Sequence, residues 1–197
     1  LQTCLKRIEI SQSELKYIAQ GGTAVGSGIN APKKFDRVFC KYLNKLTKDN
    51  YQPSQNKFEA LSSHDSLVNF SNSLKTLSIS LLKIINDIRF LASGPRSGLG
   101  ELIIPANEPG SSIMPGKVNP TQIEALSMVC VQVIGNSTTV DLAGSNGHFQ
   151  LNTYKPVIAF NIIQSVNLLA EGMKSFNNNC LKGLKANKGI IDNHLNN

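Results

Sequence analysis

Apolar residues recur at helical spacing along most of the chain, and the first such stretch covers residues 2–19. Its apolar face carries Leu5 and Ile8, and the pair of glycines that begins at Gly21 predicts its end. A second stretch with the same period covers residues 33–48. The pattern therefore predicts two successive helices near the start of the sequence.

A longer stretch without proline or glycine covers residues 58–93, and its apolar spacing predicts a single long helix. Several apolar residues lie off its main stripe, among them Ile79, Leu82 and Phe90. A helix with apolar residues on several sides is buried on several sides. Because a chain of this length has little of its own to cover such a helix, the sequence predicts that other chains pack against it.

Two further helices are predicted at 121–143 and 153–176, and the tail that follows is typical of short helix and turn. No stretch shows the alternation of β-branched residues that a sheet needs. The sequence therefore predicts an all-α fold, a bundle of long helices. Residues 94–120 form an irregular stretch that is longer than most loops, and loops of this length are often functional.

The chain has 197 residues and a formal net charge of +7. Its lysines are scattered singly or in pairs such as Lys33 and Lys34, without the basic run of a nucleic-acid-binding tail. The charge therefore indicates a generally basic surface, and no nucleic-acid partner is expected. No apolar run reaches about 18 residues, the length that spans a membrane, so no membrane contact is expected either.

The four cysteines are far apart in the sequence, and none belongs to a Cys-x-x-Cys pair; they are Cys4, Cys40, Cys130 and Cys180. This spacing argues against a zinc site or a redox motif and is typical of reduced thiols inside a cell. Neither His64 nor His148 has a second ligand at metal-binding spacing, so we expect both in polar packing or at the surface. No metal is expected.

Glycine and proline interrupt residues 110–120 too often for a regular element. Asn119 and Pro120 are residue types preferred at a helix N-cap and at the first helical position, and Gln122 fits the third position of a capping box. A helix is therefore predicted to start at Pro120. Its N-terminus carries unpaired N–H groups and a partial positive charge.

Lys117 adds a full cation to this helix start, and Ser111 and Ser112 add hydroxyl groups on a permissive backbone. A nucleophile or base, a cation and a helix dipole in so short a stretch indicate a site for a carboxylate or phosphate substrate. The alternative is an ordinary glycine-rich connection, in which Ser111 is a turn residue and Lys117 a surface lysine.

The stretch Gly-Ser-Ser-Ile-Met-Pro-Gly-Lys-Val-Asn-Pro at 110–120 is similar, at every fixed position, to the signature of the fumarase/aspartase superfamily. Within it the chain resembles class II fumarases, because Gly116 stands where aspartases typically have alanine and Thr-Gln-Ile-Glu follows at 121–124. Further segments that look like class II fumarase are 53–61, 86–91, 93–96, 107–109 and 146–152. The resemblance covers essentially the whole chain.

This resemblance implies a hydro-lyase, a fumarate hydratase that converts fumarate reversibly to malate in the tricarboxylic acid cycle, without metal or organic cofactor. It implies that Ser111 is the catalytic base, which removes a proton next to a carboxylate and leaves an aci-carboxylate intermediate. Ser112 matches a hydroxyl that contacts the substrate, and Lys117 and Asn119 match the carboxylate-binding pair. Glu124 matches the carboxylate that orients a catalytic histidine; the alternative is that it only stabilises its helix N-terminus.

The resemblance also implies a homotetramer, in which four central helical domains form a shared multi-helix core and each active site draws on three chains. Residues 1–197 then correspond to the central domain, a fragment without N-terminal and C-terminal domains and without the segment that carries the catalytic histidine. We therefore expect this fragment alone to be inactive. Fumarases of this class occur in bacterial cytoplasm and in mitochondria, so we expect a cytoplasmic location, with the mitochondrial matrix as the alternative.

Residues 22–30 lack the glycine spacing of a dinucleotide-binding fingerprint and follow a helix rather than a strand, which excludes that site. They resemble a family segment that implies a close-packed turn near the substrate pocket. Ser27, Gln150 and Tyr154 depart mildly from family habit. Two other functions stay open: a sister lyase such as aspartate ammonia-lyase, and a non-catalytic, truncated helical scaffold.

Overall fold

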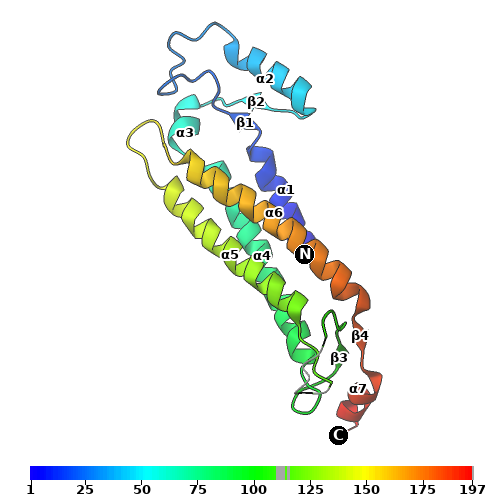
Figure 1. The fold of residues 1–197 in the computed structure, drawn as a ribbon. Helices are drawn as coiled ribbons and strands as arrows, with labels where there is room; N and C mark the ends of the chain where they lie inside the picture. The colour runs from blue at the N-terminus through cyan, green and yellow to red at the C-terminus, as the bar shows by residue number, and fades with distance from the viewer. Residues whose placement is uncertain (110–113, 115, 197) are drawn as a thin grey trace. The chain divides into compact units, whose positions relative to one another are not determined.

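The structure is a computed structural model that describes residues 1–109, 114 and 116–196, and it is all-α, as the sequence predicts (Figure 1). Three helices are long: α4, α5 and α6. The helices of the described chain are α1 Gln2–Glu14, α2 Phe35–Thr47, α3 Lys57–Ser62, α4 Asp65–Leu91, α5 Thr121–Gly144, α6 Lys155–Asn179, the 3-10 helix η1 Leu181–Gly183 and α7 Lys188–Leu195.

Extended structure is confined, within the described residues, to four two-residue strands. β1 (Tyr17–Ile18) pairs in parallel with β2 (Gln52–Pro53), and β3 (Leu102–Ile103) pairs antiparallel with β4 (Lys185–Ala186). Both pairings fasten a loop to a more distant segment and neither forms a larger sheet.

The chain divides into two compact units, and each long helix contributes residues to both. The first unit comprises Leu1–Leu77 and Gly135–Gln164, and the second comprises Ser78–Ile134 and Ser165–Asn197. Each unit is built around the apolar stripes of its own helix portions, as expected when amphipathic helices bury their apolar faces together.

The core of the first unit is apolar and is bordered by part-buried hydrogen bonds between polar side chains. Its buried apolar side chains are Cys4, Cys40, Phe70, Leu74, Leu77, Val140, Ala143, Ile158 and Ile162. Among them, Asn72 Nδ2 donates to Asp141 Oδ1 at 2.9 Å, and Asn136 Nδ2 donates to Gln164 Oε1 at 2.9 Å. Because a buried polar group without a partner is costly, these bonds favour one register of the helices over others.

The second unit has a more continuously apolar core. Its buried apolar side chains are Leu81, Ile85, Ile123, Leu126, Cys130, Val133, Leu169, Phe176 and Cys180. At Gly172, an added Cβ would lie 3.3 Å from Leu126 Cδ1 and 3.4 Å from Val129 Cγ2. The absence of a side chain there lets α6 lie close to α5 in this unit.

The single helix predicted at 58–93 is wrong, because α3 and α4 are separate and Ser63 between them is extended (φ −112°, ψ 154°). The Ser63 N–H donates to Glu59 O and ends α3, while Ser63 Oγ accepts from the Asp65 N–H at the start of α4. Side-chain capping therefore breaks the helix where neither proline nor glycine marks a break.

The first helix is also shorter than predicted, since α1 ends at Glu14 and Tyr17–Ile18 forms β1. The predicted helices at 33–48, 121–143 and 153–176 are confirmed to within three residues at each end. The tail contains short helix and turn, as expected.

Helix α5 has the length and hydropathy of a membrane-spanning helix, with a mean hydropathy of 1.2 over 18 residues. By this measure the expectation that no segment has the apolar length of a span is wrong for α5. The core helices of soluble proteins pass the same test, so one such helix is weak evidence for a membrane. The side chains of Asn136 and Ser137 in the same helix are polar and buried.

Candidate functional site

The loop after α4 is fastened at its start by a closed turn. The Gly100 N–H donates to Ser93 O at 2.8 Å, and the Leu99 N–H donates to Ser93 Oγ at 3.1 Å. An added Cβ at Gly98 would lie 2.4 Å from the Ser93 carbonyl, so this turn closes only around glycine. The predicted functional loop at about 94–120 therefore begins from a fixed point at the end of a long helix.

The same loop is tied to the C-terminal tail within the second unit. The Asn187 N–H donates to Glu101 O at 2.8 Å, and Asn187 Nδ2 donates to Gly100 O at 2.9 Å. Asn107 Nδ2 donates to Asn179 O at 3.0 Å, at the end of α6. These bonds and the pairing of β3 with β4 hold the loop against residues 179–187 before it reaches the signature.

The signature residues are described only in part. Ser111 and Ser112, the predicted base and substrate hydroxyl, lie outside the described residues. Lys117 is exposed, and its N–H donates to Met114 O at 3.2 Å. Asn119 is half-buried, two residues before α5. The structure therefore places a lysine and an asparagine in the approach to a helix N-terminus. That they bind an anion there stays a prediction.

Helix α5 starts at Thr121, as the predicted range 121–143 has it, and one residue after Pro120, the predicted first helical position. The Glu124 N–H donates to Pro120 O at 3.0 Å. The predicted capping box is not observed, because Gln122 Oε1 accepts a hydrogen bond from Ser175 Oγ of α6 at 2.8 Å. The Gln122 side chain thus bonds to α6 instead of capping its own helix. The local sequence pattern could not indicate this partner.

Glu124 lies in the first turn of α5, and its carboxylate meets Arg89 of α4. Arg89 Nη2 donates to Glu124 Oε1 at 3.2 Å, with the two side chains 53% and 44% exposed. Sequence reasoning identified Glu124 but missed Arg89. An arginine in the last turn of the long helix, directly before the loop, does not by itself indicate which group it contacts.

A cavity of about 560 Å³ adjoins the signature loop within the second unit. Its lining includes Gly116 and Val118 of the loop and Arg96 of the preceding turn. His194 also lines it, and His194 Nδ1 lies 2.9 Å from Glu101 Oε1. The cavity offers an arginine and a histidine beside the predicted substrate loop.

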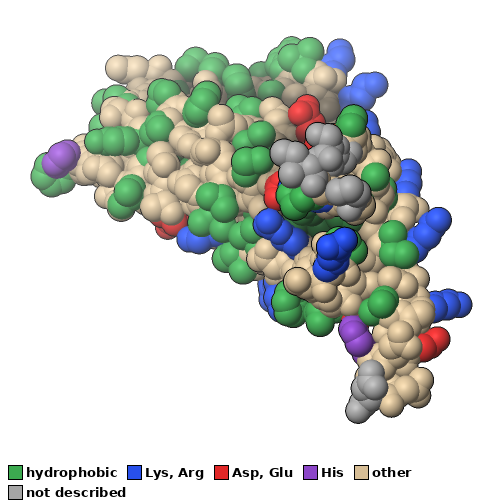
Figure 2. All heavy atoms as spheres, turned by 60° about the horizontal axis from the view of Figure 1, so that its bottom comes forward, with side chains coloured by type: hydrophobic (Ala, Val, Ile, Leu, Met, Phe, Trp, Pro, Cys, Tyr) green, Lys and Arg blue, Asp and Glu red, His purple; other side chains and the backbone are tan. Residues whose placement is uncertain are grey.

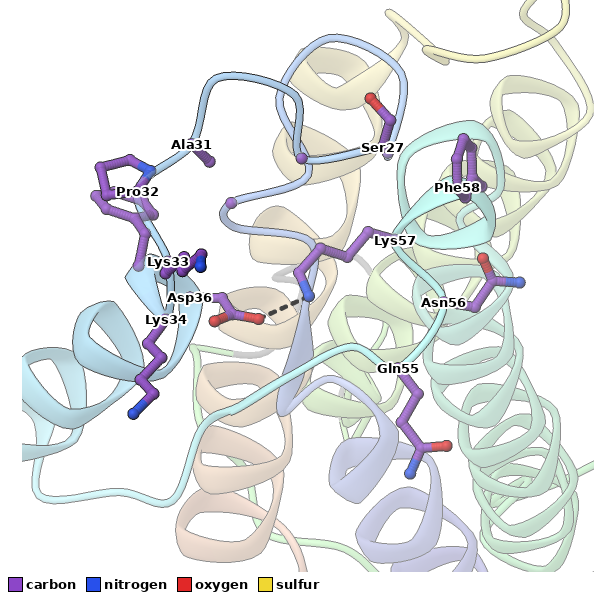
Figure 3. A pocket seen from close by; sticks show the side chains of 14 residues that line it. Ser27, Ala31, Pro32, Lys33, Lys34, Asp36, Gln55, Asn56, Lys57 and Phe58 are labelled. Atoms are coloured by element: carbon purple, nitrogen blue, oxygen red, sulfur yellow. Dashed lines mark hydrogen bonds and ion pairs between the residues drawn. The ribbon is translucent and has the colours of Figure 1, made fainter.

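A second cavity, of about 340 Å³, lies in the first unit around the glycine-rich turn (Figure 3). Lys57 Nζ and Asp36 Oδ2 form an ion pair at 2.7 Å there, and the hydrogen bond from Lys57 holds the pKa of Asp36 below its usual range. At Gly26 (φ +105°) an added Cβ would lie 2.5 Å from the backbone of Phe58. The close packing predicted for this turn is therefore observed, and its place near the substrate pocket stays a prediction.

No group of three or more metal-ligating side chains gathers among residues 1–109, 114 and 116–196. His64 is buried, with its Nε2 3.2 Å from Lys155 Nζ, which is the polar packing predicted for it. All four cysteines are buried and free of disulfides, and burial raises the pKa of Cys130 to about 11.

Comparison with known proteins gives consistent results at the levels of sequence and fold. Residues 1–135 match the family model described as lyase. The chain is 56% identical to fumarate hydratase class II of Rickettsia conorii over 192 residues, which are 98% of this chain and 42% of that protein. It is 55% identical to the mitochondrial fumarate hydratase of Dictyostelium discoideum, over 95% of this chain and 39% of the relative.

The crystal structure of class II fumarase from Schistosoma mansoni superposes with a TM-score of 0.94 at 40% identity, over 98% of this chain and 43% of that one. The chain thus spans about two fifths of the length of the curated relatives it matches. These findings confirm the resemblance to class II fumarases that the signature loop indicated, and the chain belongs to the lyase family.

Proposed function

We propose that the protein is a fumarate hydratase, which adds water reversibly to fumarate to give malate. The observation that carries this proposal is the complete signature at 110–120, followed by Thr-Gln-Ile-Glu, in a chain 56% identical to a class II fumarate hydratase. Because the chain spans about two fifths of such relatives, the activity belongs to a longer protein of which residues 1–197 are the central helical domain, with the functional loop at about 94–120.

The reaction explains why the site needs these residue types. In the dehydrating direction, a base removes a proton from the carbon next to a carboxylate, and the electron pair moves into that carboxylate as an aci-carboxylate dianion. Donors and cations fixed in advance stabilise such charge most effectively. Lys117, Asn119 and the N-terminus of α5 supply a cation, an amide donor and a dipole along one short segment.

Ser111 is the proposed base. A serine hydroxyl is a weak base at neutral pH and acts only if its alkoxide is stabilised. The neighbouring cation of Lys117 supplies such stabilisation, and Ser112 contributes a second hydroxyl to the substrate. At the other end of the reaction, Glu124 orients a histidine that lies outside this sequence and that acts on the departing hydroxyl.

The active protein is a homotetramer with active sites shared between chains. In support, large apolar side chains are exposed on the long helices of both units, and Figure 2 shows hydrophobic side chains reaching the surface on one face. Those more than half exposed on α4, α5 and α6 are Ile79, Phe90, Met128, Val131, Leu142, Phe160 and Ile163. Solvent-exposed apolar stripes on long helices are typical of surfaces that another chain covers.

The test is fumarate formation from malate, followed by ultraviolet absorbance, in the full-length protein and in its Ser111→Ala variant. We expect the variant to lose about two or more orders of magnitude in kcat at unchanged oligomer mass. Ser97→Ala, an exposed serine in the same loop, serves as the control and should keep full activity. An active Ser111→Ala variant would remove Ser111 from the mechanism.

The same assay with aspartate separates the proposed reaction from ammonia elimination. A full-length protein that releases ammonia from aspartate and ignores malate would contradict the proposal.

The relatives include bacterial proteins and one named mitochondrial, which correspond to the two compartments expected for this protein. A cytoplasmic location, with the mitochondrial matrix as the alternative, therefore stays a prediction.

A further inference from the structure

A cavity of about 560 Å³ in the first unit, open to solvent and lined at the ends of several helices, has no part in the proposed reaction. Its walls are mainly apolar and include Leu67 of α4 and Ile162 and Ile163 of α6. Two nitrogen-bearing side chains, His64 and Lys155, also line it. The cavity therefore combines an apolar interior with a pair of titratable groups.

The two nitrogens are in direct contact. Lys155 Nζ lies 3.2 Å from His64 Nε2 and donates to Asn152 O at 3.1 Å. Three carboxylates line the same cavity, Glu14, Glu59 and Asp65, yet Lys155 forms no ion pair with any carboxylate in the part of the chain that the structure describes. An amine and an imidazole at this distance are not both protonated without strong repulsion.

The position of both groups on the fold further disfavours their charged forms. Lys155 is the first residue of α6, and His64 directly precedes α4, so each lies at the positive end of a long helix. Burial lowers the pKa of Lys155, and burial together with the nearby Lys155 charge lowers the pKa of His64. A larger share of the Lys155 amine is therefore neutral at a given pH than for an ordinary surface lysine.

The pair differs in accessibility in a way that suits a reaction at the amine. His64 is 5% exposed, whereas Lys155 belongs to the exposed residues. A reagent in solution can therefore reach the amine, while the imidazole beneath it is shielded and can accept its proton. A neutral amine with a base in contact is the arrangement that activates lysine as a nucleophile.

We propose that Lys155 is a lysine-acylation site, at which Nζ takes an acyl group from an activated donor such as an acyl phosphate and His64 Nε2 accepts the proton released. The nitrogen lone pair attacks the acyl carbon, a C–N bond forms, and the C–O bond to the phosphate breaks. The phosphate leaves with the electron pair of that bond, and the proton passes from Nζ to His64. The product is a neutral amide, which removes a cation from two helix N-termini, and the apolar wall accommodates the acyl chain.

The test uses the full-length protein with acetyl phosphate as the probe at pH 7.5, and peptide mass spectrometry at successive times. Lys41 and Lys188 are exposed lysines of α2 and α7 and serve as internal controls. We expect Lys155 to be acetylated about threefold or more faster than either control. A Lys155 rate equal to or below theirs would overturn the proposal, whether or not the protein proves to be a fumarate hydratase.

Two further measurements distinguish the effect of His64 as a base from the effect of the lowered pKa of Lys155. In the wild type, the acetylation rate of Lys155 should stop rising at a lower pH than is usual for a lysine, because burial lowers the pKa of its amine. In His64→Gln, which keeps a hydrogen-bond acceptor without a base, the Lys155 rate should fall to the level of Lys41 while the melting temperature is retained. An unchanged rate in a folded variant would remove His64 from the step.

Discussion

The structure adds one residue, Arg89, to those that the sequence assigns to the proposed site. Its guanidinium reaches the Glu124 carboxylate across 3.2 Å and thereby links the last turn of α4 to the first turn of α5. Both side chains are about half exposed, so the pair contributes little to stability. In the proposed mechanism the value of the pair is positional, because a carboxylate that is to orient a histidine works only from a fixed rotamer.

If Arg89 positions Glu124, then Arg89→Gln in the full-length enzyme should lower kcat about three- to tenfold with little change in KM. Arg89→Lys, which keeps the charge and loses the planar fork, should recover part of the loss. The control is Lys83→Gln, which removes an exposed cation paired with Asp87 on the same helix. Equal effects of Arg89→Gln and Lys83→Gln on kcat would show that Arg89 has no special role.

Cys130 offers a test of core packing at a single residue. It is fully buried in α5, and burial raises the pKa of its thiol to about 11 from 9.0. Because the thiolate is the reactive form, its population at pH 8 is about 100-fold lower than that of an ordinary thiol. We expect iodoacetamide to leave Cys130 unmodified in the folded protein and to alkylate it in denaturant, as read by peptide mass spectrometry. Alkylation of the folded protein at the rate of a free thiol would contradict the packing.

At the scale of elements, the sequence pattern predicts the type of every long helix because apolar spacing determines which side is buried. It does not predict the break between α3 and α4, since Ser63 acts there through a hydrogen bond to Asp65 rather than through backbone chemistry such as that of proline. It misassigns Gln122 for a different reason: its partner Ser175 is distant in the sequence. The Ser63 bond is local but is made by a side chain, which apolar spacing does not reveal, whereas the Gln122 bond forms only when the folded chain brings α5 and α6 together.

The same limit applies to the site. Lys117, Asn119 and Glu124 could be named in advance because the signature is contiguous and leads into a helix start. Arg89 could not, because its distance from Glu124 depends on how α4 and α5 pack in the second unit. The roles of all five residues, Ser111, Ser112, Lys117, Asn119 and Glu124, stay predictions, since they rest on the signature.

The close packing of the glycine-rich turn in the first unit predicts that a side chain at Gly26 destabilises the protein. Gly26 has φ +105°, and an added Cβ would meet the Phe58 backbone at 2.5 Å, so Gly26→Ala imposes both backbone strain and a clash with main chain. We expect a loss of about 2 kcal/mol or more in unfolding free energy, measured as a drop of several degrees in melting temperature. Gly189→Ala is the matched control, because nothing lies within 4 Å of its added Cβ in α7. A Gly26→Ala protein as stable as this control would mean that the turn is not packed as described.

At the scale of the whole molecule, the exposed apolar side chains of α5 and α6 are the main feature that one chain leaves unexplained. Val131 is 62% exposed and Phe160 is 63% exposed, although both belong to helices whose other faces form the cores of their units. Exposed side chains of this size on long helices carry a cost in water that burial against another chain removes. The proposed homotetramer would cover them. It would also meet the expectation from the sequence that the long helical stretch at 58–93 is covered on more than one side.

The proposed homotetramer predicts that a charge among the exposed apolar side chains of α5 weakens assembly. Val131→Asp in the full-length protein should shift the mass measured by light scattering after size exclusion from four copies toward fewer, because an unpaired carboxylate in an apolar interface is costly to desolvate. Since the proposed active sites draw on several chains, fumarate hydration should fall with the tetramer population rather than independently of it. Lys188→Asp, a charge change at an exposed polar residue of α7, should alter neither quantity. If Val131→Asp keeps both the four-copy mass and full activity, this part of α5 faces solvent and the tetramer must be assembled through other surfaces.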